Sequence, residues 1–361
     1  MSRTARRVVA VMLLAVAVYF AFAFYTGFDK VAHSLHGFAW WTFGAACGLA
    51  FFNYVLRFFK WEYYLSVLGI RGIPKGESFL TFLSGFVLTV TPGKVGEVFK
   101  SVILFQLRQV PIQRTAPIVV AERVTDLIGV IALITMGSFS FDHGWRWAVI
   151  GAVVVLSLLV FVSSPRLARR FLDLLPRLPG PPGRAAGRMV PKLEEALDQL
   201  RELTTPRRLV WPTLLSIAAW TSEGVALWVI LGGFQTARPG LPFTAFVYAT
   251  ATLAGALIPV PGGLGVTDGI IKGQLSALGG VPAGTDTAAM MLVRFATLWF
   301  AVAVGFVALA ILRATRPWLS GEEPTAAVPV PVPVAGRLGS AEAGVPNASG
   351  EAIGGADANT P

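Results

Sequence analysis

The sequence has little charge for its length. Charged residues make up 14% of its 361 residues, against about 25% in soluble domains. Hydrophobic residues make up 54%, and several runs without charge approach the roughly 20 residues needed to cross a bilayer. A soluble fold of this size could not bury so much apolar surface. The chain is therefore expected to be an all-α integral membrane protein that crosses the bilayer several times, and not a soluble enzyme.

Cysteine and histidine are also scarce. Cys47 is the only cysteine, and the three histidines (His33, His36 and His143) lie near the ends of apolar segments. One cysteine excludes a disulfide framework, and no cysteine or histidine pair has the spacing of a zinc site. Gly263-Leu264-Gly265 resembles part of a dinucleotide fingerprint but follows no strand, and no Walker loop occurs. We expect neither metal nor cofactor.

The net charge of +10 does not predict nucleic-acid binding, because the basic residues cluster at the chain ends and between apolar segments. That distribution is typical of the positive-inside rule. Three arginines precede the first apolar segment, and Arg313 and Arg316 close the last. Both termini are expected in the cytoplasm, with the chain in the cell membrane.

Six transmembrane helices are expected, at residues 8–26, 38–56, 117–139, 147–164, 209–231 and 287–312. Residues 57–78 mix aromatic and basic side chains, which favours a segment in the headgroup layer. A basic insert at 165–208, with a short amphipathic helix at 189–203, is expected in the cytoplasm. The transmembrane domain covers 1–316, and the Pro- and Ala-rich tail at 317–361 is expected to be disordered.

Two apolar stretches are interrupted by similar breaks, Pro92-Gly93-Lys94-Val95-Gly96 and Pro261-Gly262-Gly263-Leu264-Gly265. The apolar stretch before the first break, Phe79–Thr91, is too short as a helix to span the bilayer, and the one before the second break is Phe243–Val260. Irregular backbone at membrane depth is tolerated only where protein or a wet cavity covers it. We therefore expect two re-entrant helical hairpins. Three crossings separate half one (1–142) from half two (143–316), which predicts an inverted repeat, an architecture of many transporters.

Ionisable side chains at membrane depth are costly and usually face partners or a water-filled cavity. The glycines of the breaks allow a ligand to approach backbone amides, and anions bind at helix N-termini. A phosphate headgroup held by the basic residues, with the acids holding a cationic part or a coupling proton, is one interpretation. For Glu122 and Arg123 the other interpretation is that they pair with residues of other helices and only fix helix packing. For Lys100 the other interpretation is that its side chain snorkels to the interface. Glu223, in the fifth helix, is either a packing partner or a functional acid. The candidate substrate-binding residues are Lys94, Glu97, Lys100, Glu122, Arg123, Asp126, Asp268 and Arg294, and the break residues are Pro92, Gly93, Gly96, Pro261, Gly262, Gly263 and Gly265.

Four motifs occur in order: the first break, Ala121-Glu122-Arg123-Val124-Thr125-Asp126, the second break, and Arg294-Phe295-Ala296-Thr297-Leu298-Trp299. Together they resemble the lysylphosphatidylglycerol synthetase transmembrane-region family. The resemblance covers about residues 5–315. The family commonly has Glu where this chain has Asp268, a conservative departure.

That resemblance implies a flippase-like membrane region that moves a modified lipid between leaflets. In the larger synthetases, a separate soluble domain performs the aminoacyl transfer, and only a short tail follows Leu312 here. Translocation of a phospholipid or lipid-linked headgroup is therefore the first hypothesis. The rivals are a membrane partner of a glycosyltransferase or synthetase, docked through the insert at 165–208, and an intramembrane headgroup transferase with Glu122 or Asp126 as general base.

Overall fold

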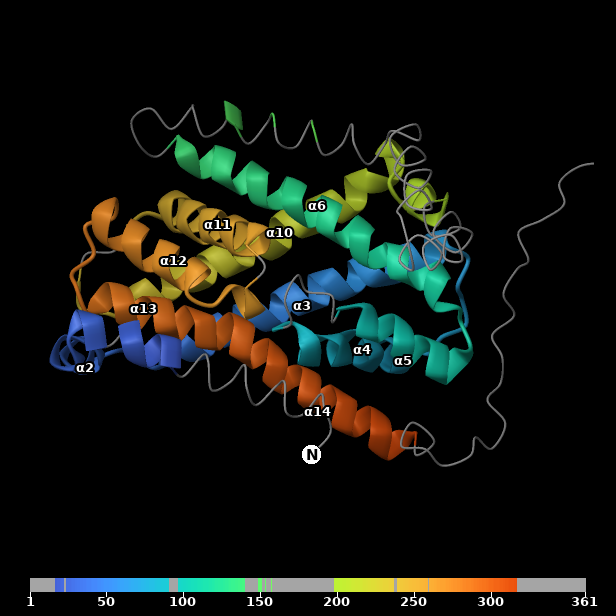
Figure 1. Ribbon diagram of the computed structural model, residues 1–361, viewed down its shortest axis with the longest axis horizontal. Coiled ribbons are helices and arrows are strands. Elements are labelled where there is room, and N and C mark those ends of the chain that lie inside the picture. Colours follow the sequence, from blue (N-terminus) through green and yellow to red (C-terminus); the bar gives the residue numbers. More distant parts are fainter. Residues whose placement is uncertain are drawn as a thin grey trace, which may run out of the picture.

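The computed structural model describes residues 17–22, 24–90, 97–139, 149–150, 153, 157, 198–236, 239–258 and 260–316, and all regular structure in these ranges is helical. The all-α class is confirmed for them. Figure 1 shows an elongated molecule in which the longer helices run obliquely along the long axis. The helices are α2 (Phe28–Leu35), α3 (Trp41–Val67), α4 (Lys75–Ser84), α5 (Phe99–Arg108), α6 (Ile112–Ser138), α10 (Pro206–Leu231), α11 (Leu241–Leu257), α12 (Val266–Ala277), α13 (Thr285–Arg294) and α14 (Phe300–Thr315).

Three helical stretches of the described chain are long and apolar enough to cross a membrane: Trp41–Val67, Pro206–Leu231 and Thr285–Thr315. The last comprises α13 and α14, joined without interruption by a π-helical turn at Phe295–Trp299. The chain is thus a multi-pass membrane protein, while the number of six crossings stays a prediction. Residues 17–22 and 24–26 of the first expected helix are helical. The helix expected at 147–164 and most of the insert at 165–208 fall outside the described residues.

The boundaries predicted for two helices were wrong. Helix α3 does not end near residue 56 but continues to Val67, so residues 57–67 are not a separate segment in the headgroup layer. Aromatic and aliphatic side chains continue the buried face of α3 through Trp61, Tyr64 and Leu65, and this packing outweighs the two basic residues among them. Helix α6 begins at Ile112 rather than at residue 117.

Both Pro-Gly breaks are flanked by short helices. In the second half of the sequence, α11 and α12 lie side by side (Figure 1). The Thr250 hydroxyl of α11 donates to the side-chain oxygen of Gln274 on α12 at 2.8 Å. Between them, Pro261–Gly263 forms a tight 3₁₀ turn. In the first half, α4 and a 3₁₀ turn (Gly85–Leu88) precede the break, and α5 follows it. Pro92, Gly93, Lys94 and Gly96 themselves lie outside the described residues.

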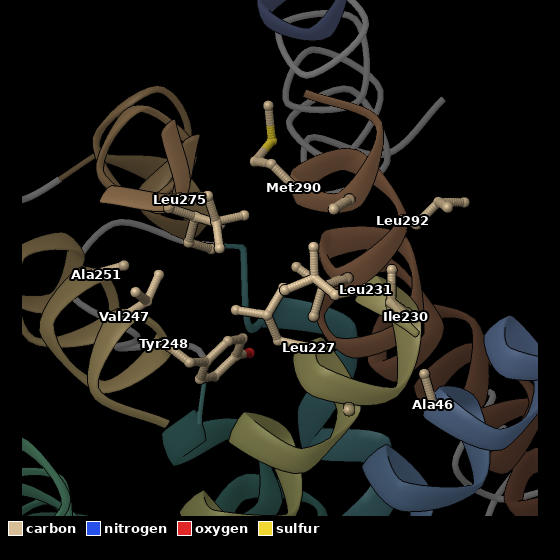
Figure 2. Close-up of a cluster of buried hydrophobic side chains, with 14 of the residues drawn as sticks. Ala46, Leu227, Ile230, Leu231, Val247, Tyr248, Ala251, Leu275, Met290 and Leu292 are labelled. Atoms are coloured by element: carbon tan, nitrogen blue, oxygen red, sulfur yellow. The ribbon is translucent and has the colours of Figure 1, made fainter. Parts of the chain in front are cut away.

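Two apolar cores hold these helices together. One lies among α10, α11, α12 and α13, where Leu227, Val247, Leu275 and Met290 meet (Figure 2). The other joins α3, α4, α5, α6 and α14, and Trp61 and Tyr64 are fully buried within it. In Figure 1 the α11–α12 pair lies towards one end of the long axis and the α4–α5 pair towards the other. The helices that precede the two breaks, α4 and α11, therefore lie towards opposite ends of the molecule.

Close packing of α6 against α11 depends on Gly137. A Cβ added at this glycine would lie 2.5 Å from the Cβ of Phe246 and 2.6 Å from the carbonyl oxygen of Pro242. Gly137→Ala is expected to lower stability by about 1–3 kcal/mol, as overpacking does in other cores. Thermal unfolding in detergent measures this. Gly48→Ala on α3, where a Cβ would have nothing within 4 Å, is the matched control and should not lower the midpoint. Equal midpoints for the two variants would contradict the close approach.

Candidate functional site

Seven of the eight predicted site residues are described, and they fall into two groups. Glu97, Lys100, Glu122, Arg123 and Asp126 lie on α5, α6 and the residues just before α5. Asp268 and Arg294 lie on α12 and α13. Lys94 is outside the described residues. Each group lies beside one Pro-Gly break, and the structure adds two basic residues to the first group.

Lys60, on the part of α3 that was predicted to lie in the headgroup layer, is fully buried, as Glu122 is. Its side chain has no exposed surface. The ammonium donates to Asp126 Oδ1 at 2.6 Å, to Ser216 Oγ at 2.8 Å and to Thr125 Oγ1 at 3.2 Å. Ser216 Oγ in turn donates to the same carboxylate oxygen at 3.0 Å. Because these acceptors belong to α6 and α10, this charge ties α3, α6 and α10 together.

Lys100 and Glu122 form a second closed pair between α5 and α6. Their charged atoms lie 2.6 Å apart, and the two side chains are 3% and 0% exposed. The Lys100 ammonium also lies over the rings of Trp61 and Phe82, at 4.6 and 5.3 Å from the centroids. Snorkelling of Lys100 to an interface is therefore wrong for this structure, because its charge is neutralised inside the protein.

Arg57 and Arg123 close the first group around Glu97. Arg123 lies 2.6 Å from Glu97 Oε2 and 3.4 Å from Asp126 Oδ2. Arg57 lies 3.7 Å from each of these two carboxylates, which is beyond hydrogen-bonding distance. Its Nε is buried with no hydrogen-bond partner. Arg57 is thus the cation of this group that is held least tightly by its neighbours.

The second group is organised around the break itself. The Arg294 Nε lies 2.7 Å from Asp268 Oδ1, and an Arg294 NH2 group donates to the carbonyl of Gly262. Asp268 Oδ2 accepts from the backbone N–H of Gly265 at 2.8 Å, which caps the start of α12. The backbone at Gly262, Gly263 and Gly265 has φ of 61°, 68° and 80°, a region that side chains other than glycine avoid. Arg294 is therefore tied to this break through Asp268 and the Gly262 carbonyl, two contacts that were not predicted from the sequence.

Val90, just before the first break, lies close to the second break. A Cβ at Gly262 would lie 3.2 Å from Leu298 and 3.6 Å from Val90, and Val90 is the last described residue before the first break. A cavity of about 90 Å³ opens beside this contact. Its walls come from α3, the two break regions, α10, α11 and the π-helical turn, and they include Tyr54, Arg57, Thr89, Glu223, Tyr248, Gly263, Arg294 and Thr297.

Two arginines from different halves, Arg57 and Arg294, therefore line one cavity. The only acid on its wall among the described lining residues is Glu223, whose carboxylate accepts from the Tyr248 hydroxyl. That hydroxyl also lies 3.1 Å from Thr297 Oγ1. Two largely buried guanidinium groups on one cavity are suited to an anion with several oxygens, such as a phosphate.

Residues 7–305 match the family described as lysylphosphatidylglycerol synthase TM region. The chain belongs to this family. It is also similar to a UPF0104 membrane protein from Methanothermobacter thermautotrophicus, with 25% identity over 332 residues that cover 85% of this chain and 93% of the relative. The family resemblance drawn from the four motifs is confirmed. Because the chain is a member of the lysylphosphatidylglycerol synthase transmembrane-region family, we interpret this cavity in the context of a membrane role linked to lipid.

Sequence reasoning missed Arg57, Lys60, Ser216 and Tyr248. The first two were assigned to an interface because the second helix was ended one residue before Arg57. Their spacing of three residues places them on one helix face, and the aromatic residues that follow at helical spacing were a usable signal. Ser216 and Tyr248 carry no such signal, since single hydroxyl groups in apolar helices mark no site on their own. No group of three or more metal-binding side chains occurs within the described ranges.

Proposed function

We propose that this protein translocates a phospholipid or lipid-linked headgroup across the cell membrane, with the headgroup phosphate held between Arg57 and Arg294. The supporting observation is the cavity between the second break and the residues before the first break, lined by Arg57 from one half and Arg294 from the other. In this proposal the α4–α5 and α11–α12 pairs are re-entrant hairpins that enter from opposite faces, and both termini are cytoplasmic.

This site differs from the one expected from sequence. Arg294 keeps its predicted role, but Arg57 takes the place given to Arg123, which does not line the cavity. Lys100 and Glu122 neutralise each other, as do Lys60 and Asp126, so these four act as the framework of the site. The cavity of about 90 Å³ can hold a few water molecules, and a headgroup needs the halves to separate further.

Arg57 allows a test that leaves the framework intact. Glu97 keeps Arg123 at 2.6 Å and Asp126 keeps Lys60 at 2.6 Å when Arg57 is removed, so Arg57→Gln leaves neither of these two carboxylates without a cation. We expect this variant to fold and to lose translocation by about ten- to a hundredfold, since one charge-assisted hydrogen bond contributes about 1.5–3 kcal/mol.

The measurement is the rate at which a fluorescent phospholipid in proteoliposomes becomes accessible to a membrane-impermeant quencher. Arg114→Gln is the matched control, because Arg114 donates to the backbone carbonyl of Leu68 at 2.6 Å and does not line the cavity. The control should translocate at the wild-type rate. Wild-type protein that exchanges lipid no faster than empty liposomes would count against translocation, and an active Arg57→Gln variant would count against this site.

A further inference from the structure

A second open space lies outside the central cavity, on the surface of α12. This groove has a volume of about 630 Å³ and is lined by residues of the first helical segment (17–22 and 24–26), by α12 and by the start of α13. Most of its wall is apolar. The lining residues are Val18, Ala21, Phe22, Tyr25, Gly269, Lys272, Gly273, Ser276 and Asp286.

Glycine on α12 keeps the groove open. A Cβ at Gly273 would have nothing within 4 Å, and one at Gly269 would meet only the ring of Phe22, at 3.8 Å. Neither glycine has the positive φ that would require glycine for the backbone, and glycine costs helix stability relative to alanine. Glycine at these two positions therefore leaves room in the groove beside α12, while the backbone of α12 does not require it.

The accessible charge of the groove is positive. The Asp286 carboxylate is 2% exposed, and its Oδ1 accepts from Gly284 N, Thr287 N and Thr287 Oγ1 at the start of α13. Lys272 is only partly buried and its ammonium lies 5.6 Å from the centre of the Tyr25 ring. A lysine beside an aromatic ring above an apolar channel is a suitable arrangement for the phosphate of a lipid whose chain lies in the channel.

The groove also leads towards the proposed translocation site. Gly269 follows Asp268, the partner of Arg294, and α12 runs from the second break to Ser276 along one wall. A lipid chain in the groove would thus lie along the same helix that begins at the break. Volumes of about 300–1,000 Å³ are usual for sites that bind small molecules.

We infer that this groove binds one acyl chain of an anionic phospholipid, with the lipid phosphate at Lys272. Its role, to hold the tail of a lipid while the headgroup passes the break, rests on the function proposed above. The binding itself does not, since it can be measured without transport. A second copy of the chain and a zwitterionic lipid are the other occupants that the experiment distinguishes.

The test places a fluorophore at the rim of the groove. Cys47 is the only cysteine, so Cys47→Ser combined with Ser276→Cys gives one labelling position. The protein is reconstituted in phosphatidylcholine nanodiscs, one molecule per disc, with a small fraction of phosphatidylglycerol or phosphatidylcholine carrying brominated chains, which quench on contact. Val307→Cys, at a residue of α14 that is 59% exposed, reports the surrounding lipid.

We expect brominated phosphatidylglycerol to quench the groove label about fivefold more than brominated phosphatidylcholine, the preference that one lysine gives for anionic lipid. At Val307 the two lipids should quench equally. Gly273→Leu should remove quenching by either lipid, and Lys272→Gln should remove the preference. Gly48→Leu on α3 is the control for added bulk and should change nothing.

Equal quenching by the two lipids at Ser276, or full quenching after Gly273→Leu, would overturn the inference. So would a groove label that neither lipid quenches in single-copy discs but that becomes protected in discs with two copies, which is the result for a protein occupant. If Gly273→Leu does not fold, Lys272→Gln decides alone. A preserved lipid preference in protein that does not translocate would refute the proposed function and leave the groove assignment standing.

Discussion

Arg294→Gln should abolish translocation in proteoliposomes more completely than any other single change to the cavity. This arginine faces the cavity, pairs with Asp268 and bonds the carbonyl of Gly262, so its loss removes a phosphate ligand and releases the break. Two charge-assisted bonds of about 1.5–3 kcal/mol each correspond to a decrease of at least about a hundredfold. The fluorescent-lipid exchange rate is the measurement.

The single change also leaves Asp268 buried without its cation, which could lower activity through stability alone. Arg294→Gln combined with Asp268→Asn separates the two effects. The asparagine side-chain oxygen can still accept the bond from Gly265 N–H, and no net charge remains buried. We expect the double variant to regain the thermal midpoint of the wild type but not its exchange rate. Recovery of exchange together with stability would show that Arg294 only supports the fold.

The second large effect concerns Lys100 and Glu122. Removal of either partner leaves a buried charge unpaired, so Glu122→Leu and Lys100→Met should each lower stability by about 3–5 kcal/mol. The double variant should recover most of that loss, because apolar residues can replace a buried ion pair at little cost. Thermal or denaturant unfolding in detergent gives these values, and the double variant completes a mutant cycle.

Exchange measured on the same double variant decides what the pair does. Activity close to that of the wild type is expected, since neither residue lines the central cavity. A stable but inactive double variant would return Lys100 and Glu122 to the substrate-binding set in which sequence reasoning placed them.

Much of the fold followed from composition and from the length of apolar runs. The helices at α10, α11 and α13–α14 begin and end close to the predicted residues, because proline or glycine lies at their ends and little else competes with the apolar pattern. The end of α3 could not be placed in this way. Arg57 and Lys60 were interpreted as interfacial residues, and their carboxylate partners lie on α6 and beside α5, more than thirty residues away in sequence.

The sequence predicted the candidate site only in part. Asp268 and Arg294 were both predicted as site residues, but as ligands of a substrate. That they pair with each other was not predicted. The division of the first group into neutral pairs and one weakly held arginine depends on which helices pack together. Sequence spacing within α6 places Glu122 and Asp126 on one face but says nothing about the two different lysines that they meet.

The π-helical turn at Phe295–Trp299 sets the rotational phase between the two parts of the last span. One residue more than an α-helical turn shifts everything after it by about 100° around the axis. Arg294, just before the turn, is thereby aimed at Asp268, while Gly305, after it, faces the 3₁₀ turn before the first break, where an added Cβ would lie 2.7 Å from the Val87 nitrogen. The continuous helix α13–α14 thus contacts the second break through Arg294 and the turn before the first break at Gly305. A twist at the π-helical turn would change the orientation of these two contacts relative to each other.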